Sequence, residues 1–338
     1  MRREGGELLF PLSEHAIMGV AGVLRALPFI MRAVARFLTL LRTDPPDLVV
    51  LVDYPGLHLV MGRLARRHGI PVLHYIAPQY WAWAPWRLAR YRHCVDANLT
   101  ILPYEQRFYE RHGVASEYVG HPLLDHISAH PAAPAAVEEV RETTTVCLLP
   151  GSRRSELNAN IPQFVSIARR LRQDNPELRF VLPHVDLRRT ELITSLLSEH
   201  DGEFIEFHPG PLASWLEGSR VVLAKSGTGS LEACLHGTPT VVVYQLQSKL
   251  GDWGHRNLLT VPWVAAGNLI AGRQIVPEFV FSGDDGWRQA ERALRELMVD
   301  GAARDACLAG LADMRASMGS PGASERAAAC LLGFFDRG

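Results

Sequence analysis

The chain has 338 residues, which is enough for two domains of ordinary size with a large buried core. Its 35 Lys and Arg residues balance 36 Asp and Glu residues, and the net charge of -1 excludes an overall basic field that would hold nucleic acid. A hydrophobic share of 47% and a charged share of 21% exclude a disordered chain and a polytopic membrane protein. The five scattered cysteines form no C-x-x-C pair, which predicts reduced core thiols in a cytosolic protein.

An apolar segment at residues 16–41 carries Arg25, Arg32 and Arg36. These arginines interrupt the segment, so no charge-free run reaches the roughly 20 residues that cross a bilayer, and the N-terminus has no signal-peptide pattern. The arginines lie seven and four residues apart, on one side of a helix. Two interpretations fit equally well: a helix lying in a membrane interface, or a domain helix packed on a sheet with its arginines outward. Pro28 would kink either helix.

Short apolar runs alternate with helical patterns along most of the chain, which is typical of α/β proteins with parallel sheets. No strand is predicted before residue 48, so we expect the first sheet to be incomplete. We place the first domain at residues 1–125, and a segment rich in Ala, Pro and Glu at residues 126–142 is predicted to be a connector or an exposed helix between the domains. In the first domain the expected strands are 48–52, 72–75, 97–102 and 117–119, and the expected helices are 57–68 and 104–112.

A second alternating series fills residues 143–338, the predicted second domain. A helix start is predicted at Asn160, because Pro162 lies in the first turn and Gln163 lies three residues on. Two doubly wound, Rossmann-like domains with a cleft between them are typical of enzymes that bind nucleotides at the carboxyl ends of strands. The expected strands are 146–149, 179–182, 203–207, 220–224 and 240–244, and the expected helices are 161–173, 191–199, 230–236 and the tail from 286.

Two loops follow predicted strands of the second domain. In the first, Gly151, Ser152 and Arg153 come directly after an apolar strand, where free backbone N–H groups and a guanidinium would suit a diphosphate. A solvated turn with its arginines in water is the alternative. Neither loop has the pattern of a phosphate-transfer P-loop or of the dinucleotide fingerprint, so ATP hydrolysis and NAD chemistry are disfavoured.

The second loop contains Ser226, Gly227, Thr228 and Glu232 and leads into a helix. Backbone amides at a helix N-terminus attract anions, and Glu232 could accept hydrogen bonds from ribose hydroxyls. The alternative is an ordinary strand-to-helix turn in which Glu232 only favours the helix dipole.

Asp53 ends the predicted strand 48–52, so its carboxylate is expected at the rim of the sheet, where it could act as a general base. The alternative is an aspartate that caps the next helix. His74, Trp81 and Trp83 belong to an aromatic cluster that would line a sugar or acyl pocket, although such clusters are more often core. His121 is a further candidate for the cleft, against the commoner structural histidine.

The sequence has no metal-binding motif. It lacks H-E-x-x-H, a cysteine pair and an Asp-x-Asp that would hold a divalent ion on a nucleotide, and Asp284 and Asp285 lie in a glycine-flanked turn. A departing diphosphate would therefore depend on protein cations and helix dipoles.

Seven motifs occur in the order of one known family. Together they resemble the lipid-A-disaccharide synthases over nearly the whole chain, and jointly they are specific although each is short. The motifs are Asp53-x-Pro55; His74-Tyr75-x-x-Pro78-x-x-Trp81-Ala82-Trp83; Leu102-Pro103-Tyr104-Glu105 with Phe108-Tyr109; Gly120-His121-Pro122; Leu149-Pro150-Gly151-Ser152-Arg153-x-Ser155-Glu156; Ser226-Gly227-Thr228 with Leu231-Glu232; and Asn268-Leu269-Ile270-Ala271-Gly272-Arg273 with Pro277-Glu278.

The resemblance implies a two-domain GT-B glycosyltransferase that inverts the anomeric centre and uses neither metal nor cofactor. It implies that UDP-2,3-diacylglucosamine and 2,3-diacylglucosamine 1-phosphate (lipid X) give the disaccharide 1-phosphate and UDP, at the cytoplasmic face of the inner membrane. A peripheral membrane protein and a homodimer are expected on the same ground, and the segment 16–41 would touch the membrane.

The resemblance also implies roles for the residues that match the motifs of the family. Asp53 matches the proposed base for the acceptor hydroxyl, and Arg153 matches the arginine of the diphosphate loop. The nucleotide loop matches at Ser226, Gly227, Thr228 and Glu232, and a later donor segment matches at Asn268, Arg273 and Glu278.

The sequence also departs from the family. The family opens with a strand and a Gly-Glu-x-Ser-Gly-Asp loop that this sequence lacks, while Gly56, Gln245 and Gly267 replace an aspartate, a basic residue and a proline. A misassigned start and a shortened paralogue both account for the missing opening. The alternative functions are a non-catalytic membrane-surface or scaffold protein, and a GT-B enzyme that uses another UDP-sugar.

Overall fold

The computed structural model describes residues 5, 7, 19–141, 144–246, 254 and 258–335, with side chains from residue 27 onward in the first helix. The chain forms two compact units, each with its own parallel sheet, which confirms the predicted α/β class. The predicted domain limits at residues 125 and 142 stay a prediction. The first unit comprises Met1–Tyr80, Pro85–Thr100 and Gln106–Tyr118, and the second comprises Trp81–Ala84, Ile101–Glu105 and Val119–Gly338.

The sheet of the first unit has the strand order β1-β2-β3-β4, and all pairs are parallel. Val52 pairs with Tyr75, so the carboxyl ends of β1 and β2 lie at the same edge of the sheet. The four strands predicted in this half are confirmed. They are β1 Val49–Val52, β2 Val72–Tyr75, β3 Ala97–Thr100 and β4 Ala115–Tyr118; the helices are α2 Pro55–Arg67, α3 Tyr80–Trp83, η3 Pro85–Arg87, α4 Leu88–Tyr91 and α5 Glu105–Arg111.

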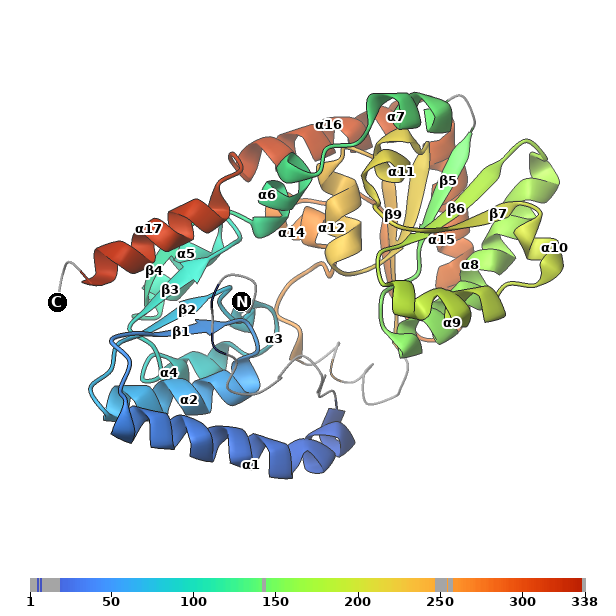
Figure 1. Cartoon of the computed structure of the whole chain (residues 1–338). Coiled ribbons are helices and arrows are strands. Elements are labelled where there is room, and N and C mark those ends of the chain that lie inside the picture. The colour runs from blue at the N-terminus through green and yellow to red at the C-terminus, as the bar shows by residue number, and fades with distance from the viewer. Residues whose placement is uncertain are drawn as a thin grey trace. The chain divides into compact units, whose positions relative to one another are not determined.

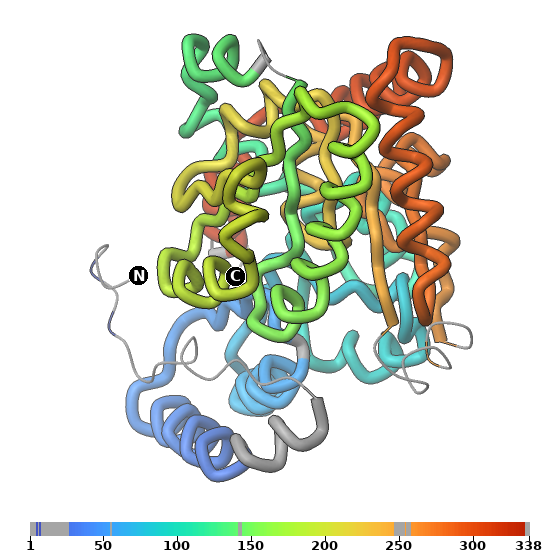
Figure 2. The backbone as a smooth tube through the Cα atoms, turned by 90° about the vertical axis from the view of Figure 1, so that its right-hand side faces the viewer, coloured from blue at the N-terminus to red at the C-terminus, as the bar shows by residue number. Residues whose placement is uncertain are grey.

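Helix α1, Gly19–Thr43, lies beside α2 (Figures 1 and 2). Ala33, Phe37 and Leu41 recur every four residues and are buried, whereas Arg32 and Arg36 are exposed. The later half of α1 therefore packs through one face on a helix rather than on a sheet, and it carries Arg32 and Arg36 on its exposed side. Pro28 lies inside α1, and the side chain of Arg25 is outside the described residues. Among the described helices, none is both long and apolar enough to cross a membrane.

The sheet of the second unit has the order β10-β9-β8-β5-β6-β7, again with parallel pairs. The order reverses between β5 and β8, because the chain winds outward from these two strands in opposite directions. Figure 1 shows helices on both faces of this sheet. The bounds are β5 Thr145–Leu149, β6 Arg179–His184, β7 Ile205–Pro209, β8 Val221–Lys225, β9 Thr240–Gln245, β10 Glu278–Phe281, α6 Pro122–Ala129, α7 Pro134–Arg141, α8 Arg154–Asp174, η4 Leu187–Arg189, α9 Thr190–Ser195, α10 Glu199–Gly202, α11 Ala213–Gly218, α12 Thr228–Leu235, α14 Ala266–Ala271, α15 Asp285–Met298, α16 Ala302–Ser317 and α17 Ala323–Phe335.

Alternate residues of β5 belong to two hydrophobic clusters. Val146 and Leu148 pack in the larger cluster, which includes residues of α8 and α15, whereas Cys147 and Leu149 pack with residues of α11 and α12. Both faces of this strand are thus covered, which explains its unbroken apolar sequence.

One helix start predicted for this half is wrong, and one strand was missed. The helix predicted to begin at Asn160 begins at Arg154, because Asn160 does not cap a helix: its side chain is buried and Nδ2 donates to the carbonyl of Pro150 at 2.7 Å. The strand β10 was not predicted, since its Glu-Phe-Val-Phe sequence is only half-buried at the sheet edge. The predicted connector contains α7 and the end of α6.

Asp125 of α6 fastens the start of α17. Its Oδ1 accepts hydrogen bonds from the backbone N–H groups of Gly322 and Ala323 at 2.6 and 2.9 Å, and its Oδ2 accepts from Ser324 at 2.8 Å. Burial on its own raises the pKa of Asp125, but these donors outweigh burial and lower the pKa. The carboxylate thus serves N–H groups that the first turn of a helix leaves without partners.

Asp125→Ala is expected to lower the free energy of unfolding by about 1–2 kcal/mol, as loss of a helix cap does. Because the folded-state pKa is lowered, the contribution is present above the unfolded-state pKa and is lost as pH falls, so mutant and wild type should converge at acid pH. Thermal unfolding between pH 7 and pH 3 measures both effects. The control Glu325→Ala removes an exposed carboxylate of the same turn and should have less effect; equal losses would contradict the capping role.

Candidate functional site

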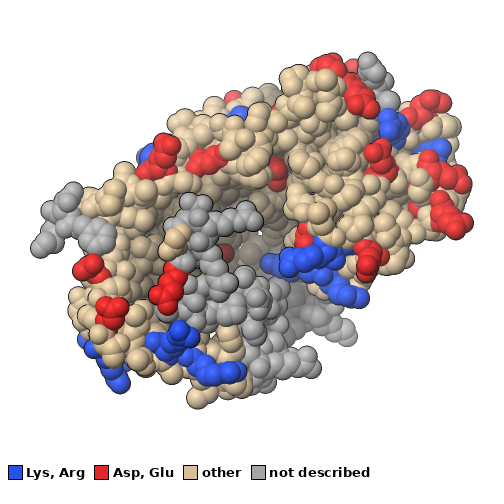
Figure 3. Space-filling model, viewed as in Figure 1, with Lys and Arg blue, Asp and Glu red and all other residues tan. Residues whose placement is uncertain are grey.

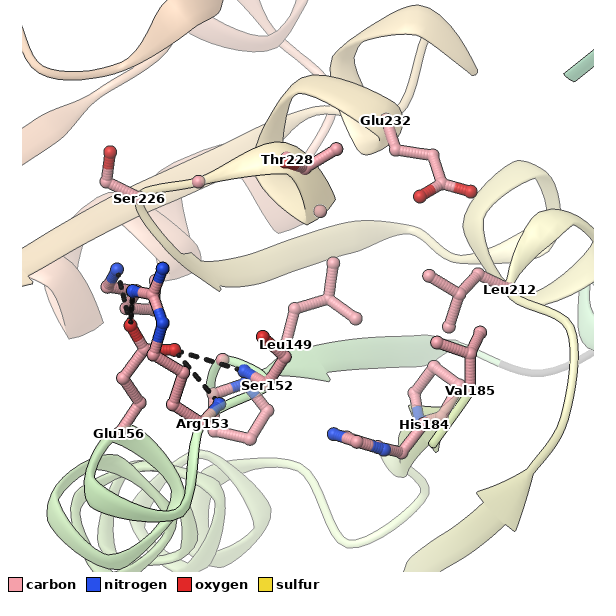
Figure 4. Close-up of a pocket in the computed structure, with 16 residues that line it drawn as sticks. Leu149, Ser152, Arg153, Glu156, His184, Val185, Leu212, Ser226, Thr228 and Glu232 are labelled. Atoms are coloured by element: carbon pink, nitrogen blue, oxygen red, sulfur yellow. Dashed lines mark hydrogen bonds and ion pairs between the residues drawn. The ribbon is translucent and has the colours of Figure 1, made fainter. Parts of the chain in front are cut away.

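A pocket of about 360 Å³ lies at the carboxyl ends of β5, β6 and β8, where the strand order reverses (Figure 4). Neighbouring strands whose connections diverge leave a crevice at this edge of an α/β sheet, and ligands bind there. The volume is within the range of small-molecule sites. The lining residues are Leu149, Pro150, Gly151, Ser152, Arg153, Glu156, Pro183, His184, Val185, Leu212, Lys225, Ser226, Gly227, Thr228, Gly229 and Glu232.

Glu156, in the first turn of α8, organises the polar side of this pocket. Its Oε1 accepts hydrogen bonds from Nζ of Lys225 and Nη1 of Arg153, each at 3.0 Å. Its Oε2 accepts from the backbone N–H groups of Ser152 at 3.1 Å and Arg153 at 3.3 Å. Burial alone raises the pKa of Glu156, but Lys225 and the loop donors outweigh it, so the pKa is lowered and the carboxylate is charged at neutral pH. One carboxylate therefore holds two cations in the pocket wall.

The structure corrects the expected chemistry of the loop after β5. The expectation of free backbone N–H groups is wrong for Ser152 and Arg153, because both donate to Glu156. The cations that line the pocket here are the Arg153 guanidinium, whose side chain is 56% exposed, and Lys225. An anion in this pocket would thus meet side-chain charges rather than these two amides.

The loop after β8 forms the opposite wall. The side chain of Ser226 faces away toward the next segment, since Oγ donates to the carbonyl of Val264 at 2.9 Å. Thr228 begins α12, whose N-terminus attracts negative charge. Figure 4 shows Glu232 across the pocket from Arg153, and burial raises the pKa of the Glu232 carboxyl. The pocket therefore offers cations at one end and a hydrogen-bond acceptor at the other.

Several lining residues were not among the predicted site residues. Lys225 and His184 end their strands at the pocket, and Val185 and Leu212 give it an apolar end (Figure 4). Nδ1 of His184 accepts a hydrogen bond from the N–H of Asp186 at 3.1 Å, and burial lowers the pKa of His184, so its ring is neutral. Their position in the sequence could have indicated Lys225 and His184 as site residues, because each of them is the last residue of a strand.

The predicted donor residues Asn268, Arg273 and Glu278 do not line this pocket. Asn268 is fully buried, with Oδ1 accepting from the N–H groups of residues 275 and 276 and Nδ2 donating to Glu278 at 2.9 Å. Glu278 also accepts from the N–H groups of residues 264 and 265, and Arg273 pairs with Asp313 at 2.8 Å. Asn268 and Glu278 thereby support the backbone to which Ser226 donates.

Asp53 follows β1 in the first unit, as predicted, and its side chain is exposed. The alternative that Asp53 caps the next helix is wrong, because Tyr54 occupies the cap position of α2 and makes no side-chain capping bond. Within the described part of the chain, the Asp53 carboxylate has no hydrogen bond or ion pair. It is therefore open to a solute.

The predicted aromatic residues and His121 differ in their exposure and in their partners. His74 is fully buried and Trp83 is 38% exposed. Nε1 of Trp81 donates to Glu105 at 2.9 Å, and burial raises the pKa of this carboxyl to about 7. His121 is the N-cap of α6, with Nδ1 accepting from the N–H of residue 123, and burial lowers its pKa to about 4. Trp81 and His121 thus have structural partners.

Metal ligands do not gather in the part of the chain that the structure describes, where no group of three or more His, Cys, Asp and Glu side chains could hold an ion. Asp284 and Asp285 lie at the start of α15. The charged chemistry of the pocket therefore rests on Lys225, Arg153 and Glu156.

Sequence comparison places the chain among known proteins. The family model described as Lipid-A-disaccharide synthetase matches residues 1–306. The chain is 36% identical over 335 residues to the lipid-A-disaccharide synthase of Anaeromyxobacter sp. (strain K), covering 98% of this chain and 87% of that protein. It is 35% identical over 332 residues to the synthase of Myxococcus xanthus (strain DK1622), covering 97% and 86%.

Solved structures share the fold. The S. aureus MnaA-UDP co-structure is similar with a TM-score of 0.62 and 16% identity, covering 91% of this chain and 81% of that chain. The UDP-GlcNAc 2-epimerase from Neisseria meningitidis bound to UDP-GlcNAc has a TM-score of 0.59 and 14% identity, covering 94% and 83%. These neighbours confirm the predicted GT-B-type fold.

Gly151→Ala tests the loop that Glu156 holds. Gly151 has φ of 115°, and a Cβ there would lie 2.6 Å from Oε2 of Glu156. The backbone alone should cost about 1–2 kcal/mol, and displacement of Glu156 should add to the loss, which thermal unfolding would register as a lower Tm. The control Gly229→Ala lines the same pocket inside α12, where its Cβ would make an ordinary 3.6 Å contact, so it should be neutral or stabilising by about 0.5–1 kcal/mol. Wild-type stability of G151A would contradict this account.

Proposed function

Because the chain belongs to the lipid-A-disaccharide synthase family, whose members are glycosyltransferases of lipid A biosynthesis, we propose that it joins UDP-2,3-diacylglucosamine to 2,3-diacylglucosamine 1-phosphate. The products are the tetraacyl disaccharide 1-phosphate and UDP. The observation that carries the proposal is the pocket between β5 and β8, in which Lys225 and Arg153 face Glu232.

The donor fits this pocket by chemistry. The diphosphate lies against Lys225, Arg153 and the N-terminus of α12, since all three attract anions. Glu232 accepts hydrogen bonds from the ribose, and the apolar end at Val185 and Leu212 receives the flat uracil ring. The proposal is supported by the fold neighbour MnaA, which was solved with UDP.

The reaction is a single displacement. Asp53 removes the proton from the acceptor hydroxyl, the oxygen forms a bond to the anomeric carbon, and the bond from that carbon to the UDP oxygen breaks. Attack from the face opposite UDP inverts the anomeric centre. Lys225 and Arg153 stabilise the negative charge that develops on UDP, the task for which other enzymes use a metal ion.

The acceptor and the product are lipids, and we place the enzyme as a peripheral protein on the cytoplasmic face of the inner membrane. Support comes from α1, where Leu27 and Met31 are 46% and 63% exposed beside the exposed Arg32 and Arg36. Figure 3 shows Lys and Arg atoms gathered over the region of α1 on the face in view. Apolar and basic side chains together suit a membrane surface with anionic headgroups. A homodimer is part of the proposal on family resemblance alone.

Arg153→Ala should weaken UDP binding by about tenfold or more, because a charge-assisted hydrogen bond to phosphate is lost. Isothermal titration calorimetry with UDP measures the change. Arg154→Ala is the matched control, since Arg154 is exposed in the same turn and does not line the pocket. Equal affinity of R153A and R154A would remove Arg153 from the donor site.

Asp53→Ala should lower sugar transfer by about a hundredfold or more, which is the usual contribution of a general base. The assay follows UDP release with the diacylated donor and lipid X. Asp47→Ala is the control, because Asp47 is exposed and precedes β1 at the other end of the strand. Activity of D53A within a few-fold of wild type would contradict the proposed base.

The same assay separates the two alternatives. Turnover of UDP-N-acetylglucosamine in preference to the diacylated donor would favour a GT-B enzyme with another UDP-sugar, which the epimerase neighbour makes worth testing. UDP binding without turnover of either donor would favour a non-catalytic protein.

A further inference from the structure

Asp53 and Tyr54 adopt a backbone conformation that side chains disfavour. Their φ angles are 51° and 47°, in the left-handed region, where Cβ crowds the following carbonyl. Two successive non-glycine residues in this region persist only where the surrounding structure holds them, and such strain is concentrated at functional sites. The contacts that hold Asp53 therefore bear on its function.

The Asp53 backbone is held on both sides. Its N–H donates to the carbonyl of Tyr75, the last residue of β2, at 3.0 Å. Its carbonyl oxygen has two histidine partners, Nδ1 of His58 at 2.7 Å and Nε2 of His74 at 3.1 Å. A carbonyl oxygen can only accept, so each of these ring nitrogens carries a proton and donates. The two donors occupy both lone pairs of the carbonyl.

The tautomer of His74 follows from this contact. Burial lowers the pKa of His74 to about 4, so the ring is neutral and carries a single proton, on Nε2. Nδ1 must then accept, and its partner is the hydroxyl of Tyr91 at 2.9 Å. Tyr91 is itself fully buried, and its one proton is therefore directed at His74.

Asn98 completes the chain of donors. Its amide lies 2.5 Å from the Tyr91 hydroxyl through Oδ1, while Nδ2 is buried with no partner among the described residues. Turning the amide by 180° exchanges these two atoms and lets Nδ2 donate to the Tyr91 oxygen, which satisfies the buried donor. The hydrogen bonds then run in one direction, from Asn98 to Tyr91, to His74, to the Asp53 carbonyl.

We propose that His74 and His58 are positioning residues that hold the strained backbone of Asp53 and thereby fix where its carboxylate points. The inference rests on the proposed function, in which Asp53 is the base. It assigns His74 a role other than the predicted contact with a substrate pocket, since its side chain is fully buried. The Asp53 carboxylate has no partner among the described residues, so the backbone is what sets its place.

The test compares substitutions that keep or remove each donor. Gln at position 74 places an amide N–H near the position of Nε2, and Asn at position 58 places one near Nδ1, whereas Leu fills a similar space without a donor. His74→Leu and His58→Leu should each lower kcat for sugar transfer by about tenfold or more, as displacement of a catalytic group does. H74Q and H58N should recover most of the loss. UDP affinity should be unchanged, because the donor pocket belongs to the second unit.

The same changes in an Asp53→Ala background separate positioning from general damage. If both histidines act through the carboxylate, H74L and H58L should lower the residual activity of D53A no further. The inference would be overturned if H74L or H58L lowered the activity of D53A by the same factor as that of the wild type. It would also be overturned if H74Q and H58N were as impaired as H74L and H58L. His58 is only half-buried on α2, so H58L and H58N keep the test decisive if H74L does not fold. Wild-type activity of D53A alone would instead overturn the proposed base.

Discussion

The ion pair between Lys225 and Glu156 is the interaction on which the pocket of the second unit depends. Lys225 ends β8 and Glu156 lies in the first turn of α8, so the pair joins the two chain segments that meet where the strand order reverses. The side chains are only 20% and 16% exposed. A partly buried pair is stable only when its remaining hydrogen bonds are satisfied, and the loop N–H groups of Ser152 and Arg153 satisfy Glu156. The position of Arg153 and the start of α8 follow from the same carboxylate.

The fold was predictable where a strand is buried on both faces. β5, β8 and β9 each contain a continuous apolar run, and these runs located each strand within about one residue. The start of α8 was not predictable from local pattern, because Asn160 resembles a helix cap yet bonds to Pro150, ten residues earlier. β10 was missed because an edge strand needs little burial, and its glutamate serves the backbone of another segment.

The candidate site also contains residues that the sequence could predict and residues that it could not. Residues that share one loop, such as Gly151 with Arg153, were recognisable because their spacing carries the signal. Pairs made by the fold were not: Glu156 and Lys225 lie 69 residues apart, and His74 reaches Asp53 only because β1 and β2 pair in the register that sets Val52 against Tyr75. A buried histidine and a pocket histidine look alike in sequence. This strand end is distinguished by the backbone angles of Asp53 and Tyr54. Neither residue type predicts such angles from the sequence.

The hydrogen bonds between Asp125 and the start of α17 have a consequence for the order in which the protein folds during synthesis. Gly322, the first backbone donor to Asp125, is translated 197 residues after it. During synthesis, Asp125 on α6 therefore emerges long before the N–H groups at the start of α17, and the contacts between α6 and α17 form only after that interval. Since chains fold as they emerge from the N-terminus onward, the start of α17 is expected to be among the later parts of the second unit to gain its native hydrogen bonds.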